Sequence, residues 1–295
     1  MLHVHPSLAD QRVVVALEST VIAHGLPYPH NLETAQMLEA VVREHGAVPA
    51  TIGVVGGVPT VGMDAAALAH FAQATPIRKL SRRDLGAAVA QGADGATTVA
   101  ATMALAHLAG IEVFATGGIG GVHRDASESW DVSADLTELS RTPLIVVCAG
   151  AKAILDLPAT LEVLETLGVL VVGYGTAELP AFYSVSSGLP LPTRADTPQE
   201  IALIWRAHQQ YGGGTGMLVC VPPPAEVALP RAEAEAAISR ALAAAAAAQV
   251  RGPAVTPFLL AAMAHETTGE SVRTNVALLR NNASVAAQIA VALHA

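Results

Sequence analysis

The sequence predicts an α/β fold, because short runs rich in Val, Ile and Leu alternate with longer helical stretches along its 295 residues. These runs are nearly continuously apolar, which is typical of strands that helices cover on both faces. Several of the helical stretches end at a glycine, a common helix stop signal. Together the three observations favour a sheet packed between two layers of helices.

Six segments have the length and composition of buried strands. Each is a short run dominated by aliphatic residues, with glycine, proline or polar residues close to its ends. In chain order, the predicted strands are residues 13–18, 50–55, 112–116, 143–149, 169–174 and 216–221.

Five segments between these strands are predicted to be helices, at residues 31–46, 81–92, 97–110, 158–168 and 197–212. Asn31 is a good N-cap for the first of them, and Gly46 is its stop. Residues 222–256 begin with prolines and are rich in alanine, which predicts an exposed helix leading to a terminal helical unit. No composition break or fixed-period repeat is visible. We therefore expect a single domain over residues 1–295, with a C-terminal helical segment at 254–295.

Composition excludes several kinds of partner. The formal net charge is -9, aromatic residues make up 3% and no basic cluster is present, which argues against nucleic acid as a ligand. A small phosphorylated molecule needs only a few local cations and stays possible. Cys148 and Cys220 lie in apolar runs, as expected of buried thiols in a reducing cytoplasm. No apolar run approaches the length of about 20 residues that a membrane span needs, and no signal peptide is visible.

Polar residues follow three of the predicted strands, and strand ends are where open α/β sheets place their sites. Glu18 ends the first strand, Thr116 and a glycine-rich turn follow another, and Lys152 follows a third. Lys152 has small apolar neighbours, which disfavour the ammonium form, and a neutral amine can attack a carbonyl to form a Schiff base. A half-buried Glu18 can serve as a general acid. The alternatives are a surface lysine near a helix start and a glutamate paired with an arginine.

Other residues are candidates for binding. Asp131 and Asp135 lie four residues apart in a polar segment that suits a cation held largely through water, or that is simply a solvated acidic loop. Lys79, with Arg82 and Arg83, is the densest basic spot and is either a phosphate clamp or an exposed helix start. The glycines that follow Thr116 could cradle a phosphate or form a tight turn. Asn275 needs a hydrogen-bond partner, which a ligand or a neighbouring element could supply.

Considered together, these segments resemble the pseudouridine-5′-phosphate glycosidase family from about residue 13 to the C-terminus. The resemblance is carried by ALESTVIAHGLPYPHNLETA, RKLSRRDL, GATTVAATMALAHLAGIEVFATGGIGGVHR, SWDVSADL, VVCAGAKAILD and NVALLRNNA. It implies a three-layer α/β/α sandwich around a mostly parallel or mixed sheet, of the indigoidine synthase A-like kind, and a homotrimer. Ala153 departs from the family pattern, which usually has a hydroxyl residue after the lysine.

The resemblance also implies the roles of individual residues. Lys152 would be the nucleophile and Glu18 the proton donor, while Asp131 would bind Mn²⁺ or another divalent cation such as Mg²⁺. The expected substrate contacts are Lys79, Thr98, Val99, Thr116, His123, Ser133, Ala134, Asp135 and Asn275. The reaction would be the reversible cleavage of pseudouridine 5′-phosphate to uracil and ribose 5-phosphate. The alternatives are an enzyme acting on another C-linked phosphorylated sugar and a non-catalytic binder of sugar phosphates.

Overall fold

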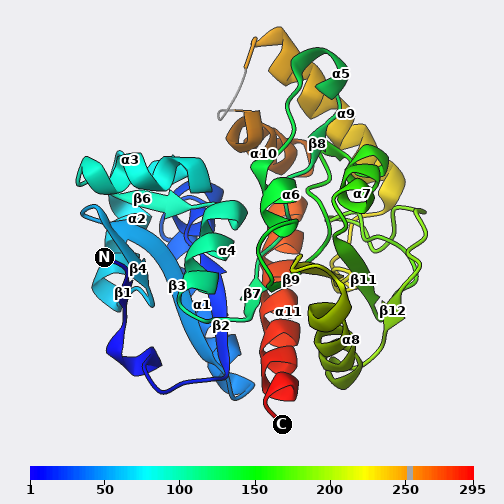
Figure 1. The fold of residues 1–295 in the computed structure, drawn as a ribbon. Coiled ribbons are helices and arrows are strands. Elements are labelled where there is room, and N and C mark those ends of the chain that lie inside the picture. Colours follow the sequence, from blue (N-terminus) through cyan, green and yellow to red (C-terminus); the bar gives the residue numbers. More distant parts are fainter. Residues whose placement is uncertain (251–254) are drawn as a thin grey trace.

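Figure 1 shows the computed structural model, which describes residues 1–250 and 255–295. Its strands include all six that the hydrophobic runs predicted. In chain order they are β1 (His3–Val4), β2 (Val14–Glu18), β3 (Val48–Val55), β4 (Val58–Val61), β5 (Arg78–Leu80), β6 (Gly95–Thr97), β7 (Val113–Ala115), β8 (Val122–His123), β9 (Ile145–Cys148), β10 (Leu155–Asp156), β11 (Leu170–Tyr174), β12 (Arg194–Ala195) and β13 (Met217–Cys220).

The central sheet is mixed but mainly parallel. Within the described part of the chain it has 11 strands, in the order β1-β4-β3-β2-β7-β9-β13-β11-β12, with β6 pairing both β3 and β5. Strand β3 is antiparallel to β4 and to β6, and the other ladders of this sheet are parallel. The short strands β8 and β10 form a separate antiparallel pair.

The sheet is covered by helices on both faces, which confirms the expected three-layer sandwich (Figure 1). Helices α1, α8 and α11 pack on one face, whereas α4, α6 and α7 lie on the other. The helices are α1 (His30–Glu44), α2 (Ala65–Gln73), α3 (Leu85–Ala90), α4 (Val99–Leu108), α5 (Ala126–Ser129), α6 (Ala134–Leu139), α7 (Leu157–Thr166), α8 (Pro198–Tyr211), α9 (Arg231–Ala247), α10 (Val255–Glu266) and α11 (Glu270–Leu293). The single helical turns are η1 (Pro6–Leu8), η2 (Val21–Gly25) and η3 (Arg82–Asp84).

Helix α11 runs through the middle of the molecule, against α1, α8 and strands β2, β7 and β9. It is the one helix in the described residues with the length and composition to cross a membrane, but 56% of its apolar window is buried inside the fold. Its apolar residues are therefore accounted for by the core. Cys148 and Cys220 are also buried, as expected, on the adjacent strands β9 and β13.

Two expectations about helices were wrong. Asn31 is not an N-cap, because α1 begins at His30 and the Asn31 amide is buried, where it donates to the carbonyls of Ile22 at 2.8 Å and Ala72 at 2.9 Å. The short polar side chain that favours caps serves equally well to satisfy buried backbone groups.

The alanine-rich helix α9 is not simply exposed. It buries one face, formed by Ala234, Ala237, Ile238, Ala241 and Ala245. Their spacing follows the helical repeat, but an alanine face is hard to tell from an alanine-rich surface in sequence. Of the predicted segments 222–256 and 254–295, residues 251–254 lie outside the described residues, and the single-domain organisation stays a prediction.

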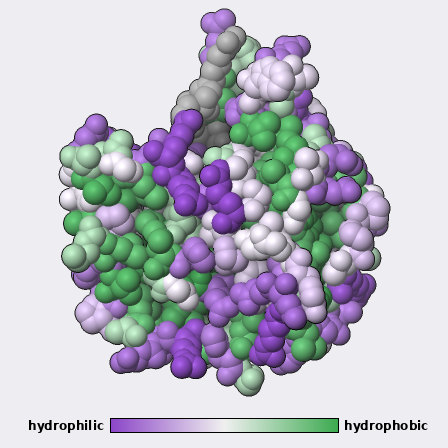
Figure 2. All heavy atoms as spheres, in the orientation of Figure 1, coloured by the Kyte–Doolittle hydropathy of each residue, from purple (hydrophilic) through white to green (hydrophobic). Residues whose placement is uncertain are grey.

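The order of strands has a consequence for the site. From β2 the chain continues to β3 on one side, and β7 later pairs with β2 on the other side. Such a switch point is where open α/β sheets bind their ligands. Figure 2 shows the surface hollowed between the region of α3 and the region of α9 and α10, with hydrophilic residues at the border.

Candidate active site

A cavity of about 470 Å³ lies at the carboxyl ends of the central strands. Strands β2, β7 and β9 are neighbours and parallel, so the residues that follow them meet at one edge of the sheet. The cavity brings together ten of the residues that the sequence marked as site candidates: Glu18, Lys79, Thr98, Val99, His123, Asp131, Ser133, Ala134, Asp135 and Lys152. They come from segments that are far apart in the sequence.

Glu18 is the last residue of β2, and its carboxylate accepts a hydrogen bond from the Thr116 hydroxyl. This pairing follows from the register, because Leu17 lies opposite Ala115 in the adjacent strand β7. Burial raises the pKa of the Glu18 carboxyl above its ordinary value, against the opposing effects of Lys152, the Thr116 hydrogen bond and Lys79. A glutamate with a raised pKa can hold a proton for donation near neutral pH.

Lys152 follows β9 through a tight turn and lines the same cavity as Glu18 and Asp131. Gly150 has φ of +84° in this turn, and a side chain there would lie 2.7 Å from the Pro180 carbonyl oxygen. The Lys152 backbone N–H donates to the Ile119 carbonyl at 3.1 Å, which ties the lysine turn to the glycine-rich loop after β7. The turn therefore directs the lysine side chain from a fixed backbone.

A second lysine lies in this cavity. Lys79 is in the short strand β5, and burial lowers the pKa of its amine, as does the nearby positive charge of Lys152, while Glu18 and Asp135 oppose the shift. The two amines thus share one partly buried space with the carboxylates of Glu18 and Asp135. Such a pair of amines could balance the charge of an anionic ligand, and each is within electrostatic reach of the other.

Asp135 organises the cavity wall. One of its carboxylate oxygens accepts the Gly120 N–H at 2.8 Å, and the other accepts the Ala100 N–H at 2.9 Å. Its side chain is buried, and it connects the glycine-rich loop to the first turn of α4. At Gly120, a side chain would come within 2.2 Å of the Ser133 hydroxyl oxygen, so this position requires glycine. Asp135, expected to contact substrate, therefore also has a structural task.

The first turn of α4 opens onto the cavity beside α6. Thr98 is the N-cap residue of α4, and its buried hydroxyl has no hydrogen-bond partner within the described residues. Val99 follows it in the cavity wall, and Ser133 and Ala134 line the cavity at the start of α6. A buried unpaired hydroxyl costs free energy unless a ligand or water satisfies it. This feature suits a polar ligand.

His123 and Asp131 lie at the mouth of the cavity, with His123 Nε2 and Asp131 Oδ2 3.7 Å apart. The chain between them turns back at Trp130, which has φ of 57°. Within the described residues, no cluster of three or more His, Cys, Asp or Glu side chains could enclose a metal ion. The Asp131 carboxylate is partly exposed, so the residues fit only a cation that keeps most of its water ligands, as Mg²⁺ commonly does.

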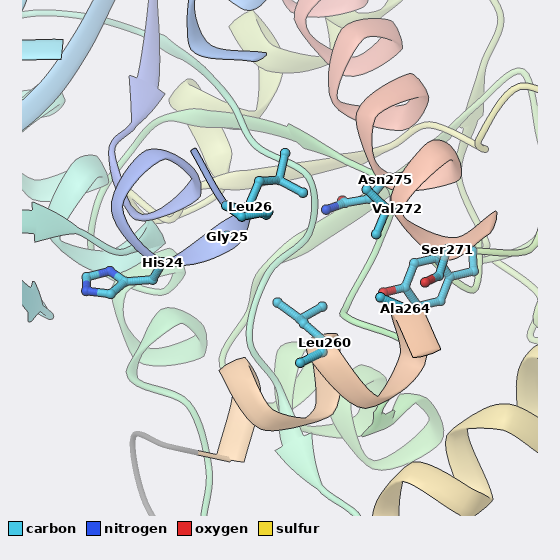
Figure 3. Close-up of a pocket in the computed structure, with 11 residues that line it drawn as sticks. His24, Gly25, Leu26, Leu260, Ala264, Ser271, Val272 and Asn275 are labelled. Carbon is cyan, nitrogen blue, oxygen red and sulfur yellow. The ribbon is translucent and has the colours of Figure 1, made fainter. Parts of the chain in front are cut away.

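Two predicted site residues lie outside this cavity. Thr116 does not line it but holds Glu18 by the hydrogen bond described above. Asn275, on α11, lines a different cavity of about 230 Å³, where its side chain points toward the turn at Gly25 and Leu26 (Figure 3). A side-chain carbon at Gly117, the residue after Thr116, would lie 3.6 Å from Asn275 Oδ1. The glycine-rich loop therefore separates Asn275 from Glu18.

The two arginines that follow Lys79 have different surroundings. Arg82 forms an ion pair with the buried Glu138 at 2.5 Å, which accounts for its charge within the fold. Arg83 lines the cavity and is well exposed. The cavity also includes residues that the sequence did not single out, among them Ser81, Trp130 and Val132. Each of them lies within two positions of a predicted site residue in the sequence, and this closeness is the signal by which they could have been found.

The fold and the cavity define an α/β protein with a lysine and a partly buried glutamate at the switch point of its sheet. The chain belongs to the indigoidine synthase A-like family, whose model matches residues 3–292. Many curated proteins are similar to it. A pseudouridine-5′-phosphate glycosidase from Herpetosiphon aurantiacus is 66% identical over 98% of this chain and 96% of its own length. One from a Roseiflexus species is 67% identical over 98% of this chain and 94% of its own.

Solved structures share the fold over the whole chain. Prealnumycin C-glycosynthase AlnA, solved in complex with ribulose 5-phosphate, is 42% identical with a TM-score of 0.91, covering 99% of this chain and 97% of its own. An indigoidine synthase A-like protein from Thermotoga maritima is 34% identical with a TM-score of 0.91, covering 100% and 97%. These similarities extend over nearly the whole length of the chain.

Proposed function

We propose that this protein is an enzyme that reversibly cleaves pseudouridine 5′-phosphate to uracil and ribose 5-phosphate. The observation that carries the proposal is the shared cavity of Lys152 and Glu18, an amine and a carboxyl with a raised pKa. The curated relatives at 66% and 67% identity, both named as pseudouridine-5′-phosphate glycosidases, support the choice of substrate. So does the ribulose 5-phosphate bound to AlnA, because it is also a phosphorylated pentose.

The bond between the sugar and uracil is a C–C bond, which has no leaving oxygen to protonate. The usual scheme of two carboxylates in glycosidases therefore does not apply. In the proposed first step, the Lys152 amine forms a bond to C1′ while the ring oxygen leaves C1′ and takes a proton. This step opens the ribose ring and leaves the sugar attached to the enzyme through nitrogen.

Cleavage follows from the lone pair on that nitrogen. It forms a C1′=N double bond as the C1′–C5 bond breaks, and the bonding pair stays with C5 of uracil. Glu18 supplies the proton that C5 takes, a task that its raised pKa suits. Water then adds to the imine, which releases ribose 5-phosphate and restores the amine. The reverse sequence joins uracil to the sugar.

The remaining cavity residues are proposed to hold the substrate. Lys79 and Arg83 carry positive charge at the cavity and would balance the phosphate. The unpaired Thr98 hydroxyl, with Val99, Ser133 and Ala134, lines the wall on which the sugar phosphate would lie. His123 would orient the uracil, and Thr116 would orient the carboxyl group of Glu18, the proposed acid.

A divalent cation, Mn²⁺ or Mg²⁺, is proposed to bind at Asp131. Support comes from the partly exposed carboxylate beside His123 at the cavity mouth. When bound, the cation would add positive charge near the substrate's anionic groups. The homotrimer and the cytoplasmic location, both expected from sequence, remain predictions.

A second candidate is the formation or cleavage of a C–C bond between a phosphorylated pentose and a ring other than uracil. It is favoured by the 42% identity to a C-glycosynthase. Incubation of the protein with pseudouridine 5′-phosphate, with and without Mn²⁺, distinguishes the candidates. We expect free uracil and ribose 5-phosphate in stoichiometric amounts. If no uracil forms either with or without Mn²⁺, the substrate assignment is wrong. If Lys152→Ala releases uracil at the wild-type rate, the lysine mechanism is wrong.

A further inference from the structure

We propose that Arg124 is a positioning residue that fixes the active-site turn of Lys152 to helix α9 through Glu235. The inference rests on the proposed function of Lys152. Arg124 follows His123 directly in the sequence, but it does not line the active-site cavity. It lines a different cavity of about 480 Å³, together with Glu235 and Arg231. His123 lines the active-site cavity and Arg124 the other one, so these two neighbouring side chains point in different directions.

The segment that Arg124 supports contains only a short ladder of its own. Strands β8 and β10 are two residues long each, with His123 opposite Leu155, and β8 has one further bridge, between Val122 and Val132. A two-stranded pair of this length has little stability of its own. Yet this pair carries His123 at one end and lies only three residues after Lys152 at the other. Its position therefore depends on further contacts, which include the hydrogen bond that the His123 N–H donates to the Asp131 carbonyl at 3.0 Å.

Arg124 adds several contacts with its whole guanidinium group. Nη2 donates to the Ala153 carbonyl at 3.0 Å, and Nε lies 3.3 Å from the Leu155 carbonyl that it donates to. The other edge of the group pairs with both carboxylate oxygens of Glu235, at 3.2 to 3.3 Å. A planar fork with five donors can make all these bonds at once, and a lysine cannot. Ala153 is the residue that follows Lys152, so the bond holds the backbone shortly after the lysine.

Glu235 attaches Arg124 to a helix that is packed in the fold. It lies on α9, a helix that is fixed to the fold by a buried face of alanine and isoleucine side chains. Figure 1 shows β8 beside α9 near the top of the molecule. Helix α9 comes from a segment that the sequence marked only as a connection to the terminal unit. Its contact with Arg124 links it to the turn that presents the proposed nucleophile.

The energetics separate this role from simple stabilisation. The Arg124 and Glu235 side chains are 33% and 44% exposed, and ion pairs of that exposure add little to global stability. A displacement of a reacting group by roughly 1 Å, in contrast, can reduce the rate by about a hundredfold. Loss of Arg124 should therefore lower kcat much more than it lowers the melting temperature.

The chain offers a matched control on the same helix. Arg240 pairs with Glu266 of α10 at 2.5 Å, with similar exposure, and touches neither strand of the β8–β10 pair. The experiment compares Arg124→Gln, Glu235→Gln, Arg124→Lys and Arg240→Gln in the full-length enzyme. The measurements are kcat and KM for pseudouridine 5′-phosphate, the melting temperature, and the rate at which borohydride traps ribose 5-phosphate on Lys152.

We expect Arg124→Gln to lower kcat and the trapping rate by about 10- to 100-fold, with KM changed by less than about threefold. Arg124→Lys should recover part of this loss, and Glu235→Gln should lose less. Arg240→Gln should keep the wild-type kcat.

The inference is overturned if Arg124→Gln matches Arg240→Gln in kcat and trapping rate, or if only KM and melting temperature change. If wild type releases no uracil but is labelled at Lys152, the substrate assignment fails and trapping rates still decide the inference. If wild type is neither active nor labelled, both fail.

Discussion

The Thr116 hydroxyl donates a hydrogen bond to the Glu18 carboxylate across the adjacent strands β7 and β2, at the point where the sheet changes its strand order. The bond stabilises the ionised carboxylate, whereas burial favours the protonated form and dominates. The protonation of the proposed acid is therefore set by burial against the opposing effects of Lys152, the Thr116 hydrogen bond and Lys79. This balance can be tested by removing one of them.

Thr116→Val removes the hydrogen bond that lowers the pKa of Glu18, so that pKa should rise further. The proton donor for uracil C5 would then persist to higher pH. Cleavage should decline at a higher pH than in the wild type, because activity falls as pH rises through the pKa of the acid. The pH profile of kcat/KM measures this shift, and Thr116→Ser, which keeps the hydroxyl, should behave like the wild type. A decline at unchanged or lower pH would contradict the assignment of Glu18.

Gly120→Ala should destabilise the cavity wall, since the added carbon would lie 2.2 Å from the Ser133 hydroxyl oxygen. We expect a loss of about 1–3 kcal/mol in the free energy of unfolding, as for other overpacked sites. Gly86→Ala is the matched control, because it lies in α3 with no atom within 4 Å of the added carbon. It should gain about 0.5–1 kcal/mol from its helical position. Urea denaturation of both variants measures the difference, and equal effects would contradict the geometry of the loop.

Asp135→Asn should also lower stability, by about 1–3 kcal/mol, because an amide nitrogen would face one of the two backbone N–H groups that now donate to the carboxylate. Asp64→Asn tests whether the charge change alone matters. Asp64 caps α2 with a bond to the Ala67 N–H, and asparagine is an equally good cap, so its variant should stay within about 0.5 kcal/mol of the wild type. Thermal melts of the two variants give the comparison. Similar losses of stability in both variants would show that the two hydrogen bonds accepted by Asp135 contribute no more than the charge change does.

Asp131→Asn tests the proposed binding of a divalent cation at Asp131. If a divalent cation binds there largely through water, removal of the charge should raise the Mn²⁺ concentration needed for half-maximal activity by about tenfold or more. Asp125→Asn, in the same acidic loop but outside the cavity, should leave that concentration unchanged. Titration of uracil release with Mn²⁺ measures both. An unchanged Mn²⁺ dependence in Asp131→Asn would place the cation elsewhere or exclude its role.

The sequence predicted the sheet well because its central strands are continuous apolar runs. The strands that it did not reveal are short, such as β5 and β10, or lie next to a turn, such as β4. In these, pairing with neighbours rather than composition determines the strand. The same cause explains Asn31, whose place was decided by two carbonyl groups from distant segments.

For the site, the sequence correctly suggested that Glu18 and Lys152 meet, because both follow strands of a parallel sheet. It gave no means of knowing that Asn275 faces a different cavity, since the packing of α11 decides this. The sequence also gave no indication that Arg124 pairs with Glu235, because the two residues are 111 positions apart. Such contacts depend on how helices pack, and no local pattern encodes them.

The central claim is that Lys152, rather than Lys79 in the same cavity, forms the imine with the sugar. The direct test is borohydride reduction of the enzyme with ribose 5-phosphate, followed by mass spectrometry of its peptides. We expect one reduced pentose phosphate on the peptide that contains Lys152, its absence in Lys152→Ala, and its retention in Lys79→Arg. An adduct on Lys79, or no adduct in the wild type, would contradict the account.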